Sequence, residues 1–393
     1  MMKRRGVAKN RKKQQNHGIC YIATVPGTIK AFFIPQLQYL AANGFDVTVV
    51  CSPSETLQTQ LGERVTYVPM DIPRGISFVG SLRAVQMLKK LFQQQRFDLI
   101  QYSTPNAAFY ASIAAKKAGV PARNYHMMGL RYMSTNGLSR VVLKTIEKIT
   151  CKNSTSIECV SQSNLEIGVG EGLFPRDKAT VVWNGSTGGV DLTRFNCAKR
   201  AAYRKEIREK LRIGQDEFVF GFVGRITRDK GIDEILEAFQ ELGSAKLLMV
   251  GSFENVTSLN QRLYQASLTD ERIIYTGSIT EVEKYYSAMN VLLLPSYREG
   301  FGNVVIEAAA MGTPAIVSNI PGPIDAVAPN KTAWLVEPRS ADNLREVMQQ
   351  AMKADSTQMG MDAAEFVRTH FDSKVLNEHI LRRKMELLGD SCE

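Results

Sequence analysis

Short apolar runs rich in β-branched and aromatic residues alternate along this chain with longer stretches of helical periodicity. This alternation is typical of βαβ units, in which right-handed crossovers join parallel strands. The first series of expected strands is residues 18–23, 47–51, 99–102 and 157–160, with a helix at 81–94. The second series is residues 218–223, 246–250, 272–275, 291–294 and 314–317. The pattern predicts an α/β protein with two parallel sheets.

The length of the chain favours two domains. A sequence of 393 residues with 44% hydrophobic composition is too long for one typical core. Between the two series lies W-N-G-S-T-G-G-V-D-L-T-R-F at 183–195, a Gly-rich stretch suited to a hinge loop. We therefore expect domains at 17–190 and 191–370, with a basic tail at 1–16 and a C-terminal helix within 371–393.

Nothing in the sequence predicts a membrane span or export. No run of about 18 apolar residues occurs, and the first thirty residues lack an apolar segment followed by a small-residue cleavage site. The six cysteines are scattered without a C-x-x-C pair, so neither a disulfide framework nor a zinc site is expected. A reducing cytosol fits these features best.

Positive charge is concentrated in the first half. Residues 1–190 hold 24 Lys and Arg against 10 Asp and Glu, whereas the remainder holds 25 against 29. Seven of the cations fall within residues 1–13. This asymmetry indicates an anionic partner, either nucleic acid or the anionic inner leaflet of a membrane, although the tail is equally consistent with a solvated segment.

A basic amphipathic helix is predicted for residues 137–152. Its apolar positions share one face and its cations flank them: Leu138, Val142, Ile146 and Ile149, and Arg140, Lys144, Lys148 and Lys152. Such a helix can lie on a membrane interface, or it can pack its apolar stripe on the core of its own domain.

Loops after the strands carry the chemistry, because open parallel sheets bind ligands outside the carboxyl ends of their strands. After the first strand of the second series comes G-R-I-T-R-D-K-G, which places Arg225, Arg228 and Lys230 before a helix that begins near residue 232. Cations beside a helix N-terminus suit a diphosphate. The alternative is an ordinary solvated basic loop.

A second loop, P-S-Y-R-E-G-F-G-N-V-V-I-E, follows the fourth strand of the second series. Gly300 and Gly302 let backbone amides approach a phosphate at a helix N-terminus near 303–305. Glu299 and Glu307 cannot help to bind a diphosphate, but carboxylates accept hydrogen bonds from vicinal hydroxyls. One facing a ribose and the other a hexose would suit a nucleotide sugar. Both are also unremarkable as surface acids near a helix start.

Together, these two loops resemble the E-x7-E retaining glycosyltransferases of glycosyltransferase family 4, which have the GT-B fold of two facing Rossmann-like domains with parallel sheets. The stretch N-G-S-T-G-G-V-D-L-T-R-F is similar to the family's interdomain element, and V-S-Q-S at 160–163 is a further match. The resemblance covers residues 17–385. The segments S-T-P-N-A at 103–107 and H-M-M-G-L-R at 126–131 look like the branch that builds lipid-linked capsule, exopolysaccharide or glycoprotein glycans.

The resemblance implies roles for individual residues of the second domain. Arg225 and Lys230 would bind the donor diphosphate, Glu307 would hold the ribose, and Glu299 would contact the sugar near its anomeric centre. The implied donor-binding residues are Glu307, Gly302, Asn303, Val304, Gly300 and Gly224. The implied catalytic residues are Glu299, Arg225, Lys230 and His126. Retention is usually assigned in this family to same-face attack with the leaving phosphate oxygen as base, so neither a carboxylate nucleophile, a metal nor another cofactor is expected.

The acceptor side is expected in the first domain, at Gly27, Thr104 and Arg131. Family members often carry a Gly-Gly loop after the first strand, where this chain has T-V-P-G-T-I-K-A-F with Gly27 alone. His126 fits a contact with a sugar hydroxyl or a structural role. Arg131 fits an acceptor pyrophosphate or a surface salt bridge.

The expected function is transfer of an N-acetylhexosamine or hexose from a UDP-sugar to an undecaprenyl-diphosphate-linked glycan. The first domain would bind the acceptor and dock on the anionic inner face of the cell membrane, so the protein would be cytoplasmic and peripheral. The second domain would bind the donor, and the C-terminal helix would cross back onto the first domain, as in GT-B relatives.

Three other classes are less consistent with the sequence. A nicotinamide oxidoreductase requires G-x-G-x-x-G after its first strand, which is absent here. A non-hydrolysing UDP-sugar epimerase shares the architecture but leaves the basic first half unexplained. A nucleic-acid-binding protein is suggested by the net charge of +10, but aromatic residues are not interleaved with the cations, so no nucleic-acid partner is expected.

Overall fold

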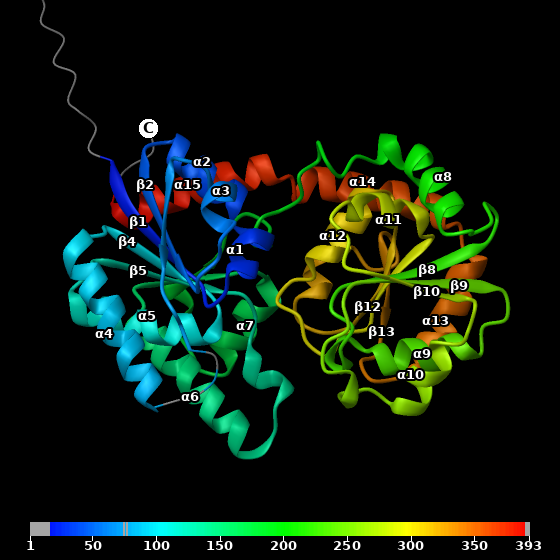
Figure 1. Cartoon of the computed structure of the whole chain (residues 1–393), viewed down its shortest axis with the longest axis horizontal. Helices are drawn as coiled ribbons and strands as arrows, with labels where there is room; N and C mark the ends of the chain where they lie inside the picture. Colours follow the sequence, from blue (N-terminus) through cyan, green and yellow to red (C-terminus); the bar gives the residue numbers. More distant parts are fainter. Residues whose placement is uncertain (1–15, 74, 76–77, 390–393) are drawn as a thin grey trace, which may run out of the picture.

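The computed structural model describes residues 16–73, 75 and 78–389, and it shows two α/β domains side by side (Figure 1). Each domain is built around one parallel sheet, so the predicted fold class is confirmed. The basic tail predicted for residues 1–16 lies outside the described residues, except for Asn16.

The first domain contains, within the described residues, a seven-stranded parallel sheet in the order β3-β2-β1-β4-β5-β6-β7. Its strands are β1 His17–Ile22, β2 Phe45–Cys51, β3 Val65–Pro69, β4 Leu99–Tyr102, β5 Ala122–Met127, β6 Ser156–Cys159 and β7 Ala179–Val181. The order reverses between β1 and β4, which is where an open parallel sheet places its binding crevice. Four of these strands were predicted to within two residues.

Helices cover both faces of this sheet. They are α1 Pro26–Phe32, α2 Ile34–Ala42, α3 Leu57–Leu61, α4 Phe78–Gln95, α5 Pro105–Ala118, α6 Gly137–Asn153 and α7 Gln162–Gly170, with 3-10 turns η1 Arg131–Ser134 and η2 Arg176–Lys178. Figure 1 shows α4, α5 and α6 beneath the sheet, with α5 packed between the other two, and α2 and α3 above it. The predicted helices at 81–94 and 137–152 are confirmed as α4 and α6.

The second domain has, in the described part of the chain, a six-stranded parallel sheet in the order β10-β9-β8-β11-β12-β13. Its strands are β8 Phe218–Val223, β9 Ala245–Val250, β10 Ile273–Gly277, β11 Val291–Leu294, β12 Ala315–Ser318 and β13 Ala333–Val336. The five predicted strands of this series are confirmed. Helices cover both faces, so a central strand such as β11 is buried at every position.

The helices around the second sheet are α8 Arg200–Lys210, α9 Ile232–Gln240, α10 Gln261–Ser267, α11 Val282–Ala288, α12 Asn303–Ala310, α13 Ala341–Lys353 and α14 Ser356–His370. Short 3-10 turns are η3 Cys197–Lys199, η4 Arg228–Lys230, η5 Val256–Ser258 and η6 Pro323–Ala326. The last helix, α15 Ser373–Leu388, leaves this domain.

Two connections join the domains, and they pair with each other. The amide of Val190 donates to the carbonyl of Phe371 at 2.8 Å, and the amide of Ser373 donates to the carbonyl of Val190 at 3.0 Å. After this point α15 lies on the first domain, where it packs against α2 (Figure 1). The Nζ atom of Lys384 is fully buried there, 2.7 Å from both carboxylate oxygens of Glu158.

The apolar stripe of α6 does not pack on the core. Leu138 is 78% exposed, and Val142 and Ile149 are each 37% exposed. The opposite side of the helix is buried instead, with Glu147 accepting a 2.7 Å hydrogen bond from the Tyr125 hydroxyl. The alternative in which the whole stripe packs on its own domain is therefore wrong.

No helix in the described residues is both long and apolar enough to cross a membrane. Five cysteines fall in the described residues and all are free thiols, of which only Cys197 is exposed.

Candidate active site in the interdomain cleft

A cavity of about 440 Å³ lies between the two domains. It sits at the carboxyl ends of β8 and β11, where the rule for open parallel sheets places a ligand. Nine of the predicted site residues line it: Gly224, Arg225, Lys230, Glu299, Gly300, Gly302, Asn303, Val304 and Glu307. The first domain contributes Ala31, Phe32, Met128, Val160 and Thr187. The structure thus brings the predicted donor residues together, and their individual roles stay predictions.

Both predicted phosphate-binding cations are paired with carboxylates. The Nζ atom of Lys230 lies 2.5 Å from Oε1 of Glu299, and both side chains are largely buried. Ser296 donates to the same oxygen at 2.8 Å. Arg225 contacts Glu254 at 2.9 Å in a pair that is about half exposed. A ligand phosphate would therefore have to compete with Glu299 for Lys230 and with Glu254 for Arg225.

Arg298 is a third cation of this cavity, and sequence analysis did not select it. Among the described residues its guanidinium makes no hydrogen bond or ion pair, and its Nε atom is buried. Burial alone would raise the pKa of the neighbouring Asp229 carboxyl. A hydrogen bond from a hydroxyl and three nearby cations, including Arg298, outweigh burial and hold this pKa below its usual value. The signal was present in the sequence, because this arginine directly precedes Glu299 in the second loop. Among the described residues that line the cavity, Arg298 is therefore the cation without a direct carboxylate partner.

Glu307 lies on α12, which begins after Gly302 in a left-handed conformation with φ of +96°. The Tyr286 hydroxyl donates to Oε2 of Glu307 at 2.8 Å, which leaves Oε1 without a protein partner among the described residues. Burial raises the pKa of this carboxyl to about 7. The arrangement offers a ligand one carboxylate oxygen and the amides of a helix N-terminus.

Position 300 requires a glycine because its backbone lies against the first domain. A Cβ atom at this position would lie 2.1 Å from the carbonyl oxygen of Met128, in the connection between β5 and α6. The side-chain Nδ2 atom of Asn164 donates to the Gly300 carbonyl at 2.8 Å. The loop after β11 therefore touches the first domain directly, a constraint that could not be identified from the sequence.

The V-S-Q-S segment forms further bonds across the cleft. The amide of Ser163 donates to Oδ2 of Asp325 at 3.2 Å, and the Ser163 hydroxyl accepts from the amide of Gly322 at 2.8 Å. On the hinge side, Ser186 donates to Oδ1 of Asn303 at 3.1 Å. These bonds hold the two domains in contact beside the cavity.

His126 lies behind the cavity wall. Its Nε2 atom is 3.5 Å from the Thr187 hydroxyl, which does line the cavity, and its Nδ1 atom is 3.8 Å from Glu158. Burial lowers the pKa of this histidine despite the neighbouring carboxylate, so the ring is a neutral hydrogen-bonding group. In this structure Thr187 lies between His126 and the cavity, so the predicted contact of His126 with a sugar would pass through Thr187.

The three predicted acceptor residues do not line this cavity. Thr104 accepts a 3.1 Å hydrogen bond from the amide of Thr24, which ties the loops after β1 and β4 together. Gly27 is exposed near the start of α1, with open space around it. Arg131 lines a separate cavity of about 300 Å³ and forms no ion pair within the described residues, so the surface salt bridge considered for it is wrong.

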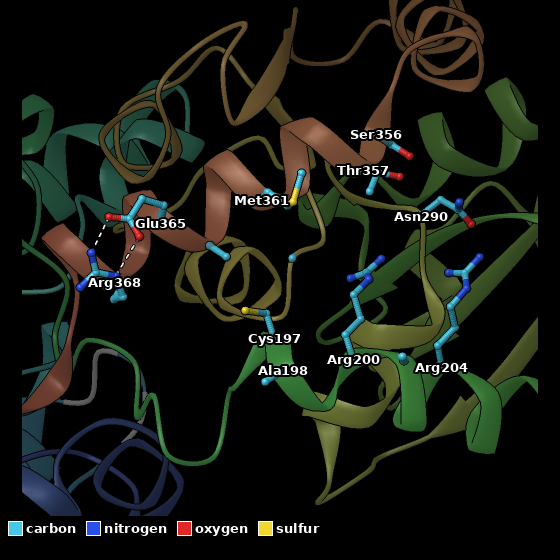
Figure 2. Close-up of a pocket in the computed structure, with 13 residues that line it drawn as sticks. Cys197, Ala198, Arg200, Arg204, Asn290, Ser356, Thr357, Met361, Glu365 and Arg368 are labelled. Atoms are coloured by element: carbon cyan, nitrogen blue, oxygen red, sulfur yellow. Dashed lines mark hydrogen bonds and ion pairs between the residues drawn. The ribbon is translucent and has the colours of Figure 1, made fainter.

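A larger cavity, of about 660 Å³, lies on the second domain between α8 and α14 (Figure 2). None of the predicted site residues lines it. Arg200 points into this region but donates to the carbonyls of Met289 and Met311, at the ends of α11 and α12. Its charge therefore stabilises two helix C-termini and is not available to a ligand.

The donor cavity offers cations for an anion. In the described part of the chain no three His, Cys, Asp or Glu side chains gather in a group that could hold a metal ion. The prediction that donor binding needs no metal stays a prediction.

Two parallel sheets, one in each domain, with a cavity of cations and carboxylates between the domains define a protein of the GT-B fold class. Residues 203–366 match the family model described as Glycosyl transferases group 1, and residues 18–161 match the one described as Glycosyl transferase 4-like. One glycosyltransferase model thus matches each domain, and the chain belongs to the glycosyltransferases.

Two curated relatives match most of the chain. CapM of Staphylococcus aureus, a capsular polysaccharide biosynthesis glycosyltransferase, is 29% identical over 373 residues, which cover 93% of this chain and 96% of the relative. The UDP-Gal:alpha-D-GlcNAc-diphosphoundecaprenol alpha-1,3-galactosyltransferase of Escherichia coli is 27% identical over 321 residues, covering 79% and 81%.

Solved structures share the fold at lower identity. Sucrose-phosphate synthase of Thermosynechococcus elongatus has a TM-score of 0.79 and 21% identity, and covers 96% of this chain and 100% of its own. HepE of Anabaena, in complex with UDP, has a TM-score of 0.77 and 16% identity, and covers 94% and 100%. At these identities the likeness establishes the fold alone.

Proposed function

We propose that this glycosyltransferase moves an N-acetylhexosamine or hexose from a UDP-sugar to a polyprenyl-diphosphate-linked saccharide, with retention of anomeric configuration. The pathway would be capsule, exopolysaccharide or glycoprotein glycan biosynthesis. The observation that carries the proposal is the convergence of three cations, three carboxylates and a helix N-terminus on one interdomain cavity. The name of the Escherichia coli relative supports the acceptor class, and the name of CapM supports the pathway. The UDP bound by HepE supports the base.

The donor would bind with its diphosphate between Lys230, Arg225 and Arg298. Arg298 is free to bind at once, whereas the other two cations exchange a carboxylate for the phosphate. The free carboxylate oxygen of Glu307 would accept from the ribose hydroxyls. Glu299, displaced from Lys230 by the phosphate, would be available to the sugar hydroxyls.

In the chemical step, the bond between the anomeric carbon and the β-phosphate oxygen breaks, and the acceptor hydroxyl forms a bond on the same face of the sugar. Its proton passes to the departing phosphate oxygen, and UDP leaves. Lys230 and Arg298 would stabilise the charge that develops on that oxygen, an effect commonly worth about 3 to 4 kcal/mol per donor group. The contacts of Gly300 with Met128 and Asn164 would exclude water while this happens.

The acceptor would approach from the first domain, past Met128 and Thr187, with His126 supporting Thr187 from behind. Neither a metal nor another cofactor has a role in the step. A lipid-linked acceptor implies that the protein works as a peripheral protein on the cytoplasmic face of the membrane.

Calorimetric titration with UDP, GDP and ADP in the presence of a chelator tests the donor half. We expect micromolar binding of UDP that Lys230→Ala and Arg298→Ala each weaken at least tenfold, or about 1.4 kcal/mol. Arg228→Ala is the matched control, because Arg228 lies in the same turn but pairs with Asp233 away from the cavity.

Transfer is then measured by mass spectrometry with prenyl-diphosphate-linked GlcNAc as acceptor, and the anomer is assigned by NMR. A chain that binds none of the three nucleotides, or that loses as much affinity with Arg228→Ala as with Lys230→Ala, contradicts the donor site. An inverted product contradicts the proposed course of the step.

A further inference from the structure

The outer side of α4, η1 and α6 carries most of the large apolar side chains that the structure shows exposed. Seven of the nine such side chains in the described residues lie on these three helices. On α6, Leu138 is 78% exposed and Val141 is 61% exposed. Those on the other two helices are Leu82, Met87 and Met133. We call the exposed side of these three helices the α4–α6 face, and large exposed apolar side chains gathered on so few elements mark an interaction site.

On α6 the exposed apolar residues form the centre of one side of the helix. Leu138, Val142 and Ile149 recur at spacings of four and seven residues, which places them in line on a helix. Lys148 and Lys152 are exposed beside this line. The buried residues of α6 lie on the opposite side, so the domain packs without using the apolar stripe.

The charge of the α4–α6 face has one sign. Helix α4 contains no acidic residue, and Glu147, the single acid of α6, is buried against Tyr125. The exposed cations Arg83 and Lys90 of α4 have no ion-pair partner among the described residues. Apolar side chains bordered by unpaired cations are complementary to an anionic lipid surface, which offers both an apolar interior and phosphate groups.

A cavity of about 300 Å³ lies in the same layer of helices, between α5 and α6. Phe109 and Tyr110 of α5 and Leu143 and Ile146 of α6 line it, and Arg131 of η1 is its unpaired cation. An apolar cavity with one cation fits a ligand that joins a hydrocarbon chain to a phosphate.

The same loop connects this cavity to the donor site. Met128 and Gly129, which follow β5, lie against Gly300, and Arg131 comes two residues later. Two residues span at most about 7 Å. A lipid diphosphate at Arg131 would therefore present its saccharide to the interdomain cavity.

We propose that the α4–α6 face docks this protein on an anionic bilayer, and that Arg131 and its cavity hold the diphosphate and adjoining hydrocarbon of the lipid-linked acceptor. The second part rests on the proposed function, which it deepens by naming where the lipid end of the acceptor binds. Docking orients the donor cavity toward the bilayer surface, so the saccharide is transferred without leaving its carrier.

Sedimentation of the full chain with vesicles tests the docking face. Equal parts of phosphatidylglycerol and phosphatidylcholine are compared with phosphatidylcholine alone. We expect Leu138→Asp with Val142→Asp to reduce binding to the anionic vesicles at least tenfold, and Lys148→Glu with Lys152→Glu to reduce it by about fivefold per cation. The matched control is Met361→Asp, since Met361 is 56% exposed on the second domain.

The N-terminal basic residues are unchanged in all these variants, so any difference between them belongs to the face. The four substituted positions of α6 are exposed, and circular dichroism verifies that the variants are folded. Equal binding by wild type and the Leu138→Asp, Val142→Asp variant overturns the docking face. An equal loss with Met361→Asp also overturns it.

Transfer kinetics test the acceptor end. With prenyl-diphosphate-linked GlcNAc in the anionic vesicles, Arg131→Gln should raise the acceptor KM roughly tenfold or more, because a charge-assisted contact with phosphate is lost. Its affinity for UDP, measured by calorimetry, should stay within about twofold. The control Arg64→Gln removes an exposed cation at the start of β3, outside the face.

The two proposals fail in different ways. If wild type transfers sugar to the lipid-linked acceptor and neither the α6 variants nor Arg131→Gln change the rate, the face is wrong and the proposed function stands. If wild type binds vesicles through the face but transfers sugar to no prenyl-diphosphate acceptor, the proposed function and the lipid role of Arg131 are wrong and the docking face stands.

Discussion

Replacing Glu299 with glutamine is expected to tighten UDP binding while it slows sugar transfer. In the free protein the Glu299 carboxylate occupies Lys230 at 2.5 Å, so the diphosphate has to displace it. Glutamine keeps the size of the side chain but removes the charge that competes for the lysine. The same change removes the charge that would contact the donor sugar. UDP alone carries no sugar, so this loss affects transfer and not UDP binding. Affinity and turnover should therefore move in opposite directions.

The magnitudes follow from the burial of the pair. Exposed ion pairs contribute about 0.2 to 1 kcal/mol, and here the two side chains are only 18% and 13% exposed. A competition of about 1 to 2 kcal/mol corresponds to a roughly 5- to 30-fold gain in UDP affinity. Losing a charged hydrogen bond to the sugar costs about 1.5 to 3 kcal/mol, or roughly 10- to 150-fold in kcat.

The assay pairs calorimetric titration of UDP with steady-state transfer rates for wild type and Glu299→Gln. Glu254→Gln serves as the control, because its ion pair with Arg225 is about half exposed, so the change should alter UDP affinity by less than about fivefold and by less than Glu299→Gln does. If Glu299→Gln binds UDP no better than wild type does, Lys230 is not a diphosphate ligand held in reserve by Glu299, and the reasoning is refuted.

Three further predictions concern other parts of the molecule. UDP-sugar binding should weaken as the pH falls from about 8 to about 6, because protonation of Glu307, whose pKa burial raises to about 7, removes an acceptor; Glu307→Gln should flatten this calorimetric profile. Gly300→Ala should slow transfer at least about tenfold with a smaller loss of UDP affinity, since its Cβ meets the Met128 carbonyl; equal losses would contradict a closure defect. Lys384→Met should cost about 3 to 5 kcal/mol in urea unfolding by stranding a buried carboxylate, and Glu158→Gln in the same chain should restore most of it.

A uniformly apolar run made some strands easy to predict. β11, with the sequence V-L-L-L, is one example. β5 was missed because it contains Asn124 and His126, which read as polar surface. In the structure Asn124 donates to Gln101 at 3.0 Å and accepts from Ser156 at 2.8 Å. Those partners lie on neighbouring strands, so the satisfaction of a buried amide becomes visible only after the sheet has formed.

The residues of the interdomain cavity were predictable as a group because they sit in loops after strands, which the parallel topology gathers at one edge. The lack of an ion-pair partner for Arg298 could not be predicted, because it depends on which neighbouring cations are already paired with carboxylates. The need for glycine at 300 was also hidden, because it comes from a contact with the other domain. For α6, periodicity identified an apolar stripe including Leu138 but carries no information about which side of the helix meets the core.

The pairing of the two connections at Val190 and the return of α15 have a consequence for the exchange of parts between relatives. The first domain is completed by a helix encoded after the second, and Lys384 of that helix supplies the buried counter-ion of Glu158. Truncation after α14 would therefore damage the domain farthest from it in sequence. To exchange the second domain between relatives, an internal segment has to be spliced at two junctions, one near residue 190 and one near residue 372. A single crossover would leave the first domain with a foreign C-terminal helix.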